Sequence, residues 1–304
     1  MNWNYFLIII RWQNVFMIWL MQTVVYFRYV LPYCGKENYS FPSFLLFLTA
    51  TGAVLAAGNI FNDIRDIDTD SRHPLKPRLV GNEITVGRVW RWYYLLHGLL
   101  SGVIIVGLIY FDWPLLLAVI FPMASLGLYL YSTYFKSSVL VGNFMVALLC
   151  GCAVWITTLL DDHCDLKTIP DLTSRIPLIL YGYIVNAIGV TMVREIVKDK
   201  EDAKWDLLAG IQTVGSLPDR TYKWILNTFL GLCFLFNLWW FQRLSGVLTD
   251  ANWYLGLFMI FIPLGLIAAI FNLPHKPSIY SFLSKLIKIY ILFALMLLIL
   301  WQRL

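Results

Sequence analysis

Long apolar runs, separated by short polar segments, recur along the whole 304-residue chain. A helix needs about 20 predominantly apolar residues to cross the hydrocarbon core of a bilayer. Nine runs reach about that length, at 5–28, 42–61, 89–111, 114–131, 139–160, 177–197, 222–242, 252–272 and 283–302. The pattern therefore predicts an all-α, polytopic membrane protein with nine transmembrane helices.

The composition agrees with this prediction. Hydrophobic residues make up 60% of the chain and charged residues 13%, and the mean hydropathy of +0.70 lies outside the usual range of soluble domains. Arg11, Gln13 and Asn14 interrupt the first run and no small-residue cleavage site follows, so we expect it to remain as a helix. The five cysteines lack metal-ligand spacing and receive no chemical role.

Basic residues near the ends of the runs predict the orientation, because cytoplasmic loops are enriched in Lys and Arg. Fifteen of these residues fall on the side of the N-terminus and six on the other. We therefore expect an integral protein of the cell or inner membrane with a cytoplasmic N-terminus and, given an odd number of spans, an external C-terminus. The net charge of +5 suits an anionic membrane face better than nucleic acid.

The acidic residues gather in two short segments that both follow an apolar run. Of 18 Asp and Glu residues, four lie within 63–70 and five within 195–206. The segments 59–70 and 195–206 align at a constant offset of 136. The alignment pairs Asp63, Asp66 and Asp70 with Asp199, Asp202 and Asp206. This predicts one domain over 1–304 built from two pseudo-repeated halves, with aspartate-rich motifs at 62–70 and 198–206, both cytoplasmic.

The spacing of the aspartates predicts a carboxylate stripe on each helix. Positions i, i+3 and i+7 fall within roughly 60° of one another on a helix, and Asn59 and Glu195 extend the stripes by one turn. Clustered carboxylates near lipid are costly unless a cation neutralises them. Oxygen donors without His or Cys favour Mg²⁺, which bridges carboxylates to substrate phosphates. We expect a magnesium diphosphate site; the alternative is that the charges only solvate the end of the bundle.

Basic residues accompany both motifs and are candidates for binding the phosphate oxygens. They are Arg72, Lys76 and Arg78 after the first motif and Lys198 and Lys200 within the second.

The segments "NDIRDIDTD" and "KDKEDAKWD" resemble the two aspartate-rich motifs of the UbiA superfamily of intramembrane prenyltransferases. The number of spans, the motif positions and the orientation agree with that family over nearly the whole chain. The resemblance implies a bundle around a central cavity, where Mg²⁺ ions held by the six aspartates bind an isoprenoid diphosphate. Further substrate-binding positions that match are Asn14, Asn59, Asn62, Tyr131, Lys136, Asn143 and Arg194.

The implied chemistry is ionisation of an allylic diphosphate, followed by capture of a carbocation that is kept from water. An apolar cavity with aromatic rings protects such a cation, and 16% of this chain is aromatic. Tyr129 and Tyr134 fit an interfacial aromatic belt better than a cavity wall. Asn186 is interpreted as an interhelical hydrogen-bonding residue, His97 as a packing residue, and Arg11 as a snorkelling side chain.

Two segments favour one branch of the family. "DSRHPLKPRLVGNEI" and "REIVKDKEDAKWD" resemble its lipid branch, although Trp205 stands where Gly is frequent. We therefore predict transfer of a geranylgeranyl or similar polyprenyl group to a lipid acceptor, geranylgeranylglyceryl phosphate. Three alternatives stay open: an aromatic, quinone-precursor prenyltransferase; a UbiA-type terpene cyclase; and a divalent-cation transporter, whose acids should recur at bilayer depth or on both sides.

Overall fold

The structure, a computed structural model, describes most of the chain. The described residues are 3–34, 40–68, 79–160, 175–245, 250–272 and 278–300. Four residues expected at the site, Asp70, Arg72, Lys76 and Arg78, lie outside these ranges.

The described residues form helices and no named strand. Nine of their helices are long and apolar enough to cross a membrane, so the prediction of an all-α integral membrane protein with nine spans is confirmed. The spans are Trp12–Tyr33, Phe41–Arg65, Val86–Tyr110, Leu115–Phe135, Val141–Leu159, Pro177–Leu208, Asp219–Leu244, Trp253–Asn272 and Ile279–Leu300.

Several spans combine an α-helix with a short 3₁₀ or π turn. The α-helices are α1 (Trp3–Ile9), α2 (Trp12–Val25), α3 (Leu31–Cys34), α4 (Phe41–Arg65), α6 (Val86–Tyr110), α7 (Leu115–Leu130), α8 (Val141–Trp155), α9 (Arg175–Leu208), α10 (Asp219–Leu244), α11 (Asp250–Gly256), α12 (Ile262–Asn272) and α13 (Ile279–Leu300). The short turns are η1 (Tyr26–Val30), η2 (Leu79–Glu83), η3 (Tyr131–Phe135), η4 (Ile156–Leu159), η6 (Val214–Ser216) and η7 (Leu257–Phe261).

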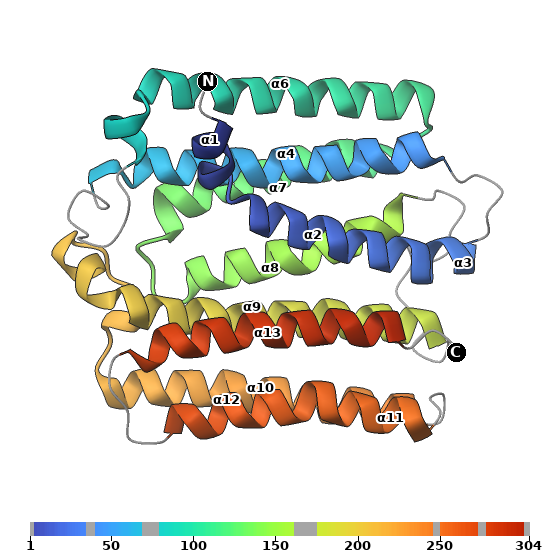
Figure 1. Cartoon of the computed structure of the whole chain (residues 1–304), viewed down its shortest axis with the longest axis vertical. Helices are drawn as coiled ribbons and strands as arrows, with labels where there is room; N and C mark the ends of the chain where they lie inside the picture. The colour runs from blue at the N-terminus through green and yellow to red at the C-terminus, as the bar shows by residue number, and fades with distance from the viewer. Residues whose placement is uncertain are drawn as a thin grey trace.

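The long helices run side by side in layers (Figure 1). Helix α6 forms one edge and packs on α4, which also contacts α7 and α2; α10 and α12 form the opposite edge. Helix α9 packs against α8, α10 and α13. The carboxyl ends of α4 and α9, where the acidic motifs lie, point to the same side of the bundle (the left in Figure 1).

The first predicted span, 5–28, is wrong in its boundaries. The chain breaks between α1 and α2 at Arg11, whose φ of 52° is left-handed, a conformation that a bulky side chain rarely adopts. The span therefore begins at Trp12 and extends through a π turn to Tyr33. The break is accompanied by a hydrogen bond from the Asn59 side chain of α4 to the carbonyl of Ile10, at 3.0 Å.

Close packing and a buried polar network fix the position of α9. A Cβ on Gly182 would lie 2.0 Å from the Trp240 ring, so α9 and α10 approach closely only because this residue is glycine. Buried Asn186 accepts hydrogen bonds from the Asn237 side chain and the Tyr290 hydroxyl, both at 3.3 Å. These bonds join α9, α10 and α13, as the interhelical interpretation of Asn186 predicts.

Candidate functional site

The first acidic motif lies where α4 ends. Asp63 belongs to the last turn of the helix, whereas Asp66 follows its final residue with φ −89° and ψ 2°. The helical stripe expected from Asp63 to Asp70 is therefore interrupted after Arg65. The chain leaves the helix at Asp66, whose carboxylate accepts a hydrogen bond from the Asn62 side chain at 2.8 Å.

Two cations from distant segments neutralise the first motif. The Arg11 guanidinium lies 3.1 Å from the Asp63 carboxylate, and both side chains are partly exposed, at 39% and 22%. The Lys136 ammonium contacts both carboxylate oxygens of Asp66, which is only 6% exposed. Because a buried carboxylate without a partner is strongly unfavourable, the Lys136 ammonium stabilises the buried charge of Asp66.

The segment between α7 and α8 joins the first motif to the second. Ser132, in η3, donates a hydrogen bond to the side-chain oxygen Oδ1 of Asn62 at 3.4 Å. Tyr131, in the same turn, interacts electrostatically with Asp66 of the first motif and with Glu195 and Asp199 of the second. The η3 turn therefore lies between the two acidic segments, as the proposed role of Tyr131 and Lys136 requires.

The second motif is wholly helical, as expected, because α9 continues to Leu208 and not only to the predicted 197. Asn143, at the start of α8, donates a hydrogen bond to the Asp199 carboxylate at 2.9 Å. The preceding Gly142 lets the start of α8 pack closely against η3, since a Cβ there would lie 2.6 Å from the Phe135 carbonyl oxygen. Two of the expected residues, Asn143 and Asp199, are thus brought together.

A short connection between α9 and α10, residues 211–218, packs against the backbone of the second motif. We call it the strap. A Cβ on Gly215 would lie 2.0 Å from the Asp199 carbonyl oxygen. Lys200, expected from the sequence to bind phosphate, instead contacts the Gly215 carbonyl at 3.2 Å and the Asp219 carboxylate at 2.8 Å. The strap therefore restrains the part of α9 that presents Asp199.

The other expected residues have more varied surroundings. Arg194 forms an ion pair with its neighbour Glu195, which is 7% exposed. Lys198, Asp202 and Asp206 are half-buried along α9, and Asn14 is exposed on α2. Their roles in binding stay predictions.

Sequence reasoning missed the roles of Arg11 and Ser132. The sequence predicts that Arg11 snorkels, but in the structure it pairs with Asp63. The signal for this contact was that Arg11 and Asn14 share one face of the first span. Ser132 offered no signal, because serines are common in membrane helices and its contact with Asn62 depends on the π turn.

The donor atoms fit Mg²⁺ better than zinc. Asp63, Asp66 and Asp199 supply carboxylate oxygens, and their neighbours Asn62 and Asn143 supply amide oxygens. Within the described ranges, no group of three or more His, Cys, Asp or Glu side chains is gathered to hold a metal. Asp70 lies outside these ranges, so the convergence of all six aspartates on metal stays a prediction.

Comparisons with known proteins show which family the chain resembles. A model of the UbiA prenyltransferase family matches residues 23–302. Digeranylgeranylglyceryl phosphate synthases from Sulfolobus acidocaldarius and Methanococcus aeolicus are 28% and 30% identical over 191 and 161 residues. These matches cover 61% and 52% of this chain, and 61% and 50% of the relatives, which is less than two thirds of either relative.

Solved structures share the fold. A structure of digeranylgeranylglyceryl phosphate synthase superposes with a TM-score of 0.71 at 18% identity, covering 98% of this chain and 97% of the other. A UbiA homolog from Archaeoglobus fulgidus, bound to GPP and Mg²⁺, gives 0.61 at 14% identity over 97% and 99%. The apo UbiA homolog from Aeropyrum pernix gives 0.64 at 10% identity over 95% and 96%.

Proposed function

Because the chain belongs to the UbiA prenyltransferase family and is a membrane-embedded prenyltransferase, we propose that it transfers a geranylgeranyl or similar polyprenyl group from its diphosphate to geranylgeranylglyceryl phosphate. The observation that supports this reaction most directly is the η3 turn. It brings Tyr131 close to acidic residues of both motifs, from different halves of the chain, and Lys136 onto Asp66 of the first motif. The names of the two relatives support the lipid acceptor.

Mg²⁺ is the cofactor that fits the oxygen donors, and the described residues that would hold it are Asp63, Asp66, Asp199, Asp202 and Asp206. When bound, it would stabilise the negative charge that develops on the departing diphosphate. The chain itself fixes two of these carboxylates beforehand. Asn143 orients Asp199 through one oxygen and Asn62 orients Asp66, so little reorganisation is needed when charge develops.

The fixed cations have a second role in the proposed reaction. Arg11 and Lys136 place positive charge beside Asp63 and Asp66, where diphosphate oxygens would approach. Tyr131 presents a ring and a hydroxyl between the motifs, and an aromatic face steadies an allylic cation by cation–π attraction. Its position favours ionisation of the donor and protection of the cation from water.

We further propose that the acidic ends of α4 and α9 face the cytoplasm, together with the N-terminus. Most Lys and Arg residues near span ends lie on that side of the sequence. A water-soluble diphosphate group then binds at the cytoplasmic end, while its prenyl chain extends into the apolar bundle.

The experiment that tests the function uses purified protein in nanodiscs with Mg²⁺, labelled geranylgeranyl diphosphate and a panel of acceptors. We expect a labelled ether lipid with geranylgeranylglyceryl phosphate, and loss of product when EDTA removes the metal. Restoration by added Mg²⁺ is the control for irreversible damage. Transfer to hydroxybenzoate or dihydroxynaphthoate instead would overturn the acceptor, a cyclised hydrocarbon would indicate a cyclase, and full activity in EDTA would overturn the metal.

Substitution of the strap glycine tests whether the backbone at Asp199 has to be held in place. Gly215→Ala inserts a Cβ against the Asp199 carbonyl, and displacement of a reacting group by about 1 Å costs on the order of 100-fold in rate. We expect a comparable fall in prenyl transfer and a higher Mg²⁺ requirement. Gly231→Ala on α10 is the matched control, because a Cβ there meets nothing within 4 Å. Equal rates for the two variants would contradict a positioning role for the strap.

A further inference from the structure

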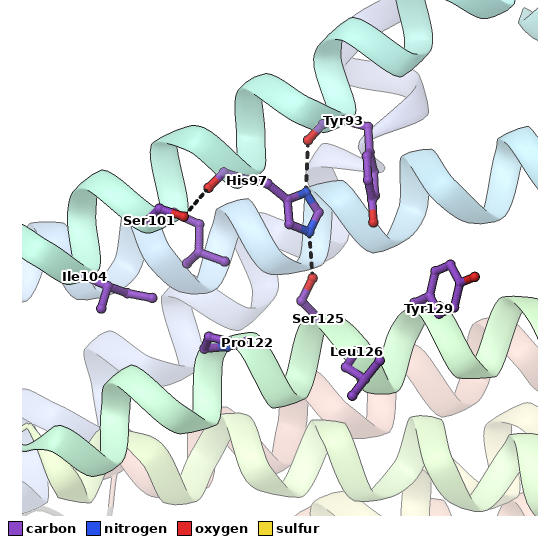
Figure 2. Close-up of a pocket in the computed structure, with 9 residues that line it drawn as sticks. Tyr93, His97, Ser101, Ile104, Pro122, Ser125, Leu126 and Tyr129 are labelled. Carbon is purple, nitrogen blue, oxygen red and sulfur yellow. Dashed lines mark hydrogen bonds between the residues drawn. The ribbon is translucent and has the colours of Figure 1, made fainter.

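A polar hollow lies between α6 and α7 (Figure 2), and none of its lining residues belongs to the acidic motifs. It has a volume of about 280 Å³ and is lined only by residues of these two helices. Its polar lining consists of Tyr93, His97, Ser101, Ser125 and Tyr129. Small or compact residues face each other at Ser101, Pro122 and Ser125, where larger side chains would close the space.

The hollow opens toward lipid. In the most apolar 18-residue stretch of the spans containing α6 and α7, only 22% and 17% is buried inside the protein. The corresponding share is 33% or more in the other candidate spans. Within its lining, Ser101 is exposed, and Leu126 and Tyr129 are 46% and 39% exposed. His97 is near the middle of the 25-residue helix α6, so its ring lies at the depth of the hydrocarbon core.

A hydrogen-bonded pair spans the two helices at this depth. His97 Nδ1 is 3.0 Å from the Tyr93 carbonyl oxygen and Nε2 is 2.9 Å from Ser125 Oγ. A carbonyl only accepts, so Nδ1 donates to it; in the tautomer with its one proton on Nδ1, Nε2 accepts the hydrogen bond of Ser125. The serine oxygen keeps its lone pairs as acceptors. Polar groups exposed to lipid at such depth are energetically unfavourable, and their presence indicates a functional site.

The lining selects the class of ligand. It contains no Lys, Arg, Asp or Glu, so nothing compensates the charge of a phosphate, carboxylate or ammonium group in the hydrocarbon region. Figure 2 shows the Tyr93 side chain directed toward α7, and Ile104 and Pro122 at the other end of the hollow. A donor, an acceptor and an apolar extension therefore follow one another along one groove.

We propose that the α6–α7 groove binds an uncharged long-chain alcohol taken from the bilayer. Its hydroxyl donates a hydrogen bond to Ser125 Oγ and accepts one from the Tyr93 hydroxyl. Its chain lies along Ile104 and Pro122. The binding is non-covalent and does not depend on the proposed transfer reaction, because no residue of the groove belongs to the acidic motifs.

The test is photolabelling of the full-length protein in phosphatidylcholine nanodiscs with a diazirine analogue of farnesol. We expect labelled peptides from α6 and α7, with labelling competed by geranylgeraniol but not by its methyl ether, which cannot donate. Ser125→Ala should lower this labelling about fivefold, the equivalent of one neutral hydrogen bond. Ser101→Leu should abolish it by filling the groove.

The matched control is Thr228→Ala, which removes a hydroxyl from the lipid-exposed face of α10, where it bonds only its own helix at the Trp224 carbonyl. Labelling of α6 and α7 should be unchanged in this variant. Labelling spread equally over α10, or equal competition by the methyl ether, would mean annular lipid only and would overturn the proposal. Thermal unfolding of each variant distinguishes a lost site from a lost fold.

Discussion

Asp199→Asn is expected to lower prenyl transfer by about a thousandfold, the upper range for removal of one preorganised electrostatic group. The substitution keeps the shape of the side chain, and its amide oxygen still accepts the hydrogen bond from Asn143. The negative charge, which the proposed metal requires, is lost. Initial rates measured with labelled geranylgeranyl diphosphate over a range of Mg²⁺ concentrations should show both a lower maximum rate and a higher Mg²⁺ requirement.

The control for this variant is Glu201→Gln in the same helix. Glu201 is exposed and lies outside the carboxylate stripe, so its loss changes the net charge of α9 equally but leaves the proposed site intact. We expect wild-type rates for Glu201→Gln. A fall of similar size in both variants would mean that α9 contributes only its overall charge, and near wild-type transfer by Asp199→Asn would exclude Asp199 from the metal site.

The spans were predictable because their signal is repeated and local. Each needs only enough consecutive apolar residues to cross the bilayer, and the described residues contain nine such helices. The enzyme family was predictable from the spacing of the aspartates, and the matching family model confirms it. The same resemblance assigned Asn143 and Asp199 to one site, and the structure adds the hydrogen bond between them.

Contacts that depend on a break in a helix were not predictable. Polar residues interrupt the first apolar run from Arg11 onward without indicating a break in the helix, yet Arg11 adopts a left-handed conformation and its side chain pairs with Asp63. Apolar content also gave no sign that α4 ends at Arg65, since Asp66 leaves the helix and is held by Lys136 from far along the chain. The contacts of Lys200 were not predictable either, because its partners, Gly215 in the strap and Asp219 at the start of α10, belong to no sequence pattern.

Removal of the Lys136 charge is expected to have the second large effect, on stability as well as on turnover. Lys136→Met leaves the Asp66 carboxylate, 9% exposed in its side chain, without its cation. Breaking a buried ion pair from one side costs about 3–5 kcal/mol; partial exposure of Lys136 places this pair at the lower end. Thermal unfolding in detergent, at a fixed scan rate, should show a clearly lowered midpoint, accompanied by loss of prenyl transfer.

The double variant Lys136→Met/Asp66→Asn separates the structural from the functional contribution of this pair. Removing the carboxylate charge as well eliminates the uncompensated buried ion, so the unfolding midpoint should return most of the way to wild type. Prenyl transfer should not return, because Asp66 is a proposed metal ligand and Lys136 a proposed diphosphate-binding cation. Recovery of both the unfolding midpoint and prenyl transfer in the double variant would show that the pair only holds η3 against α4. An unaltered midpoint in Lys136→Met would show that the buried Asp66 carboxylate does not need that cation for stability.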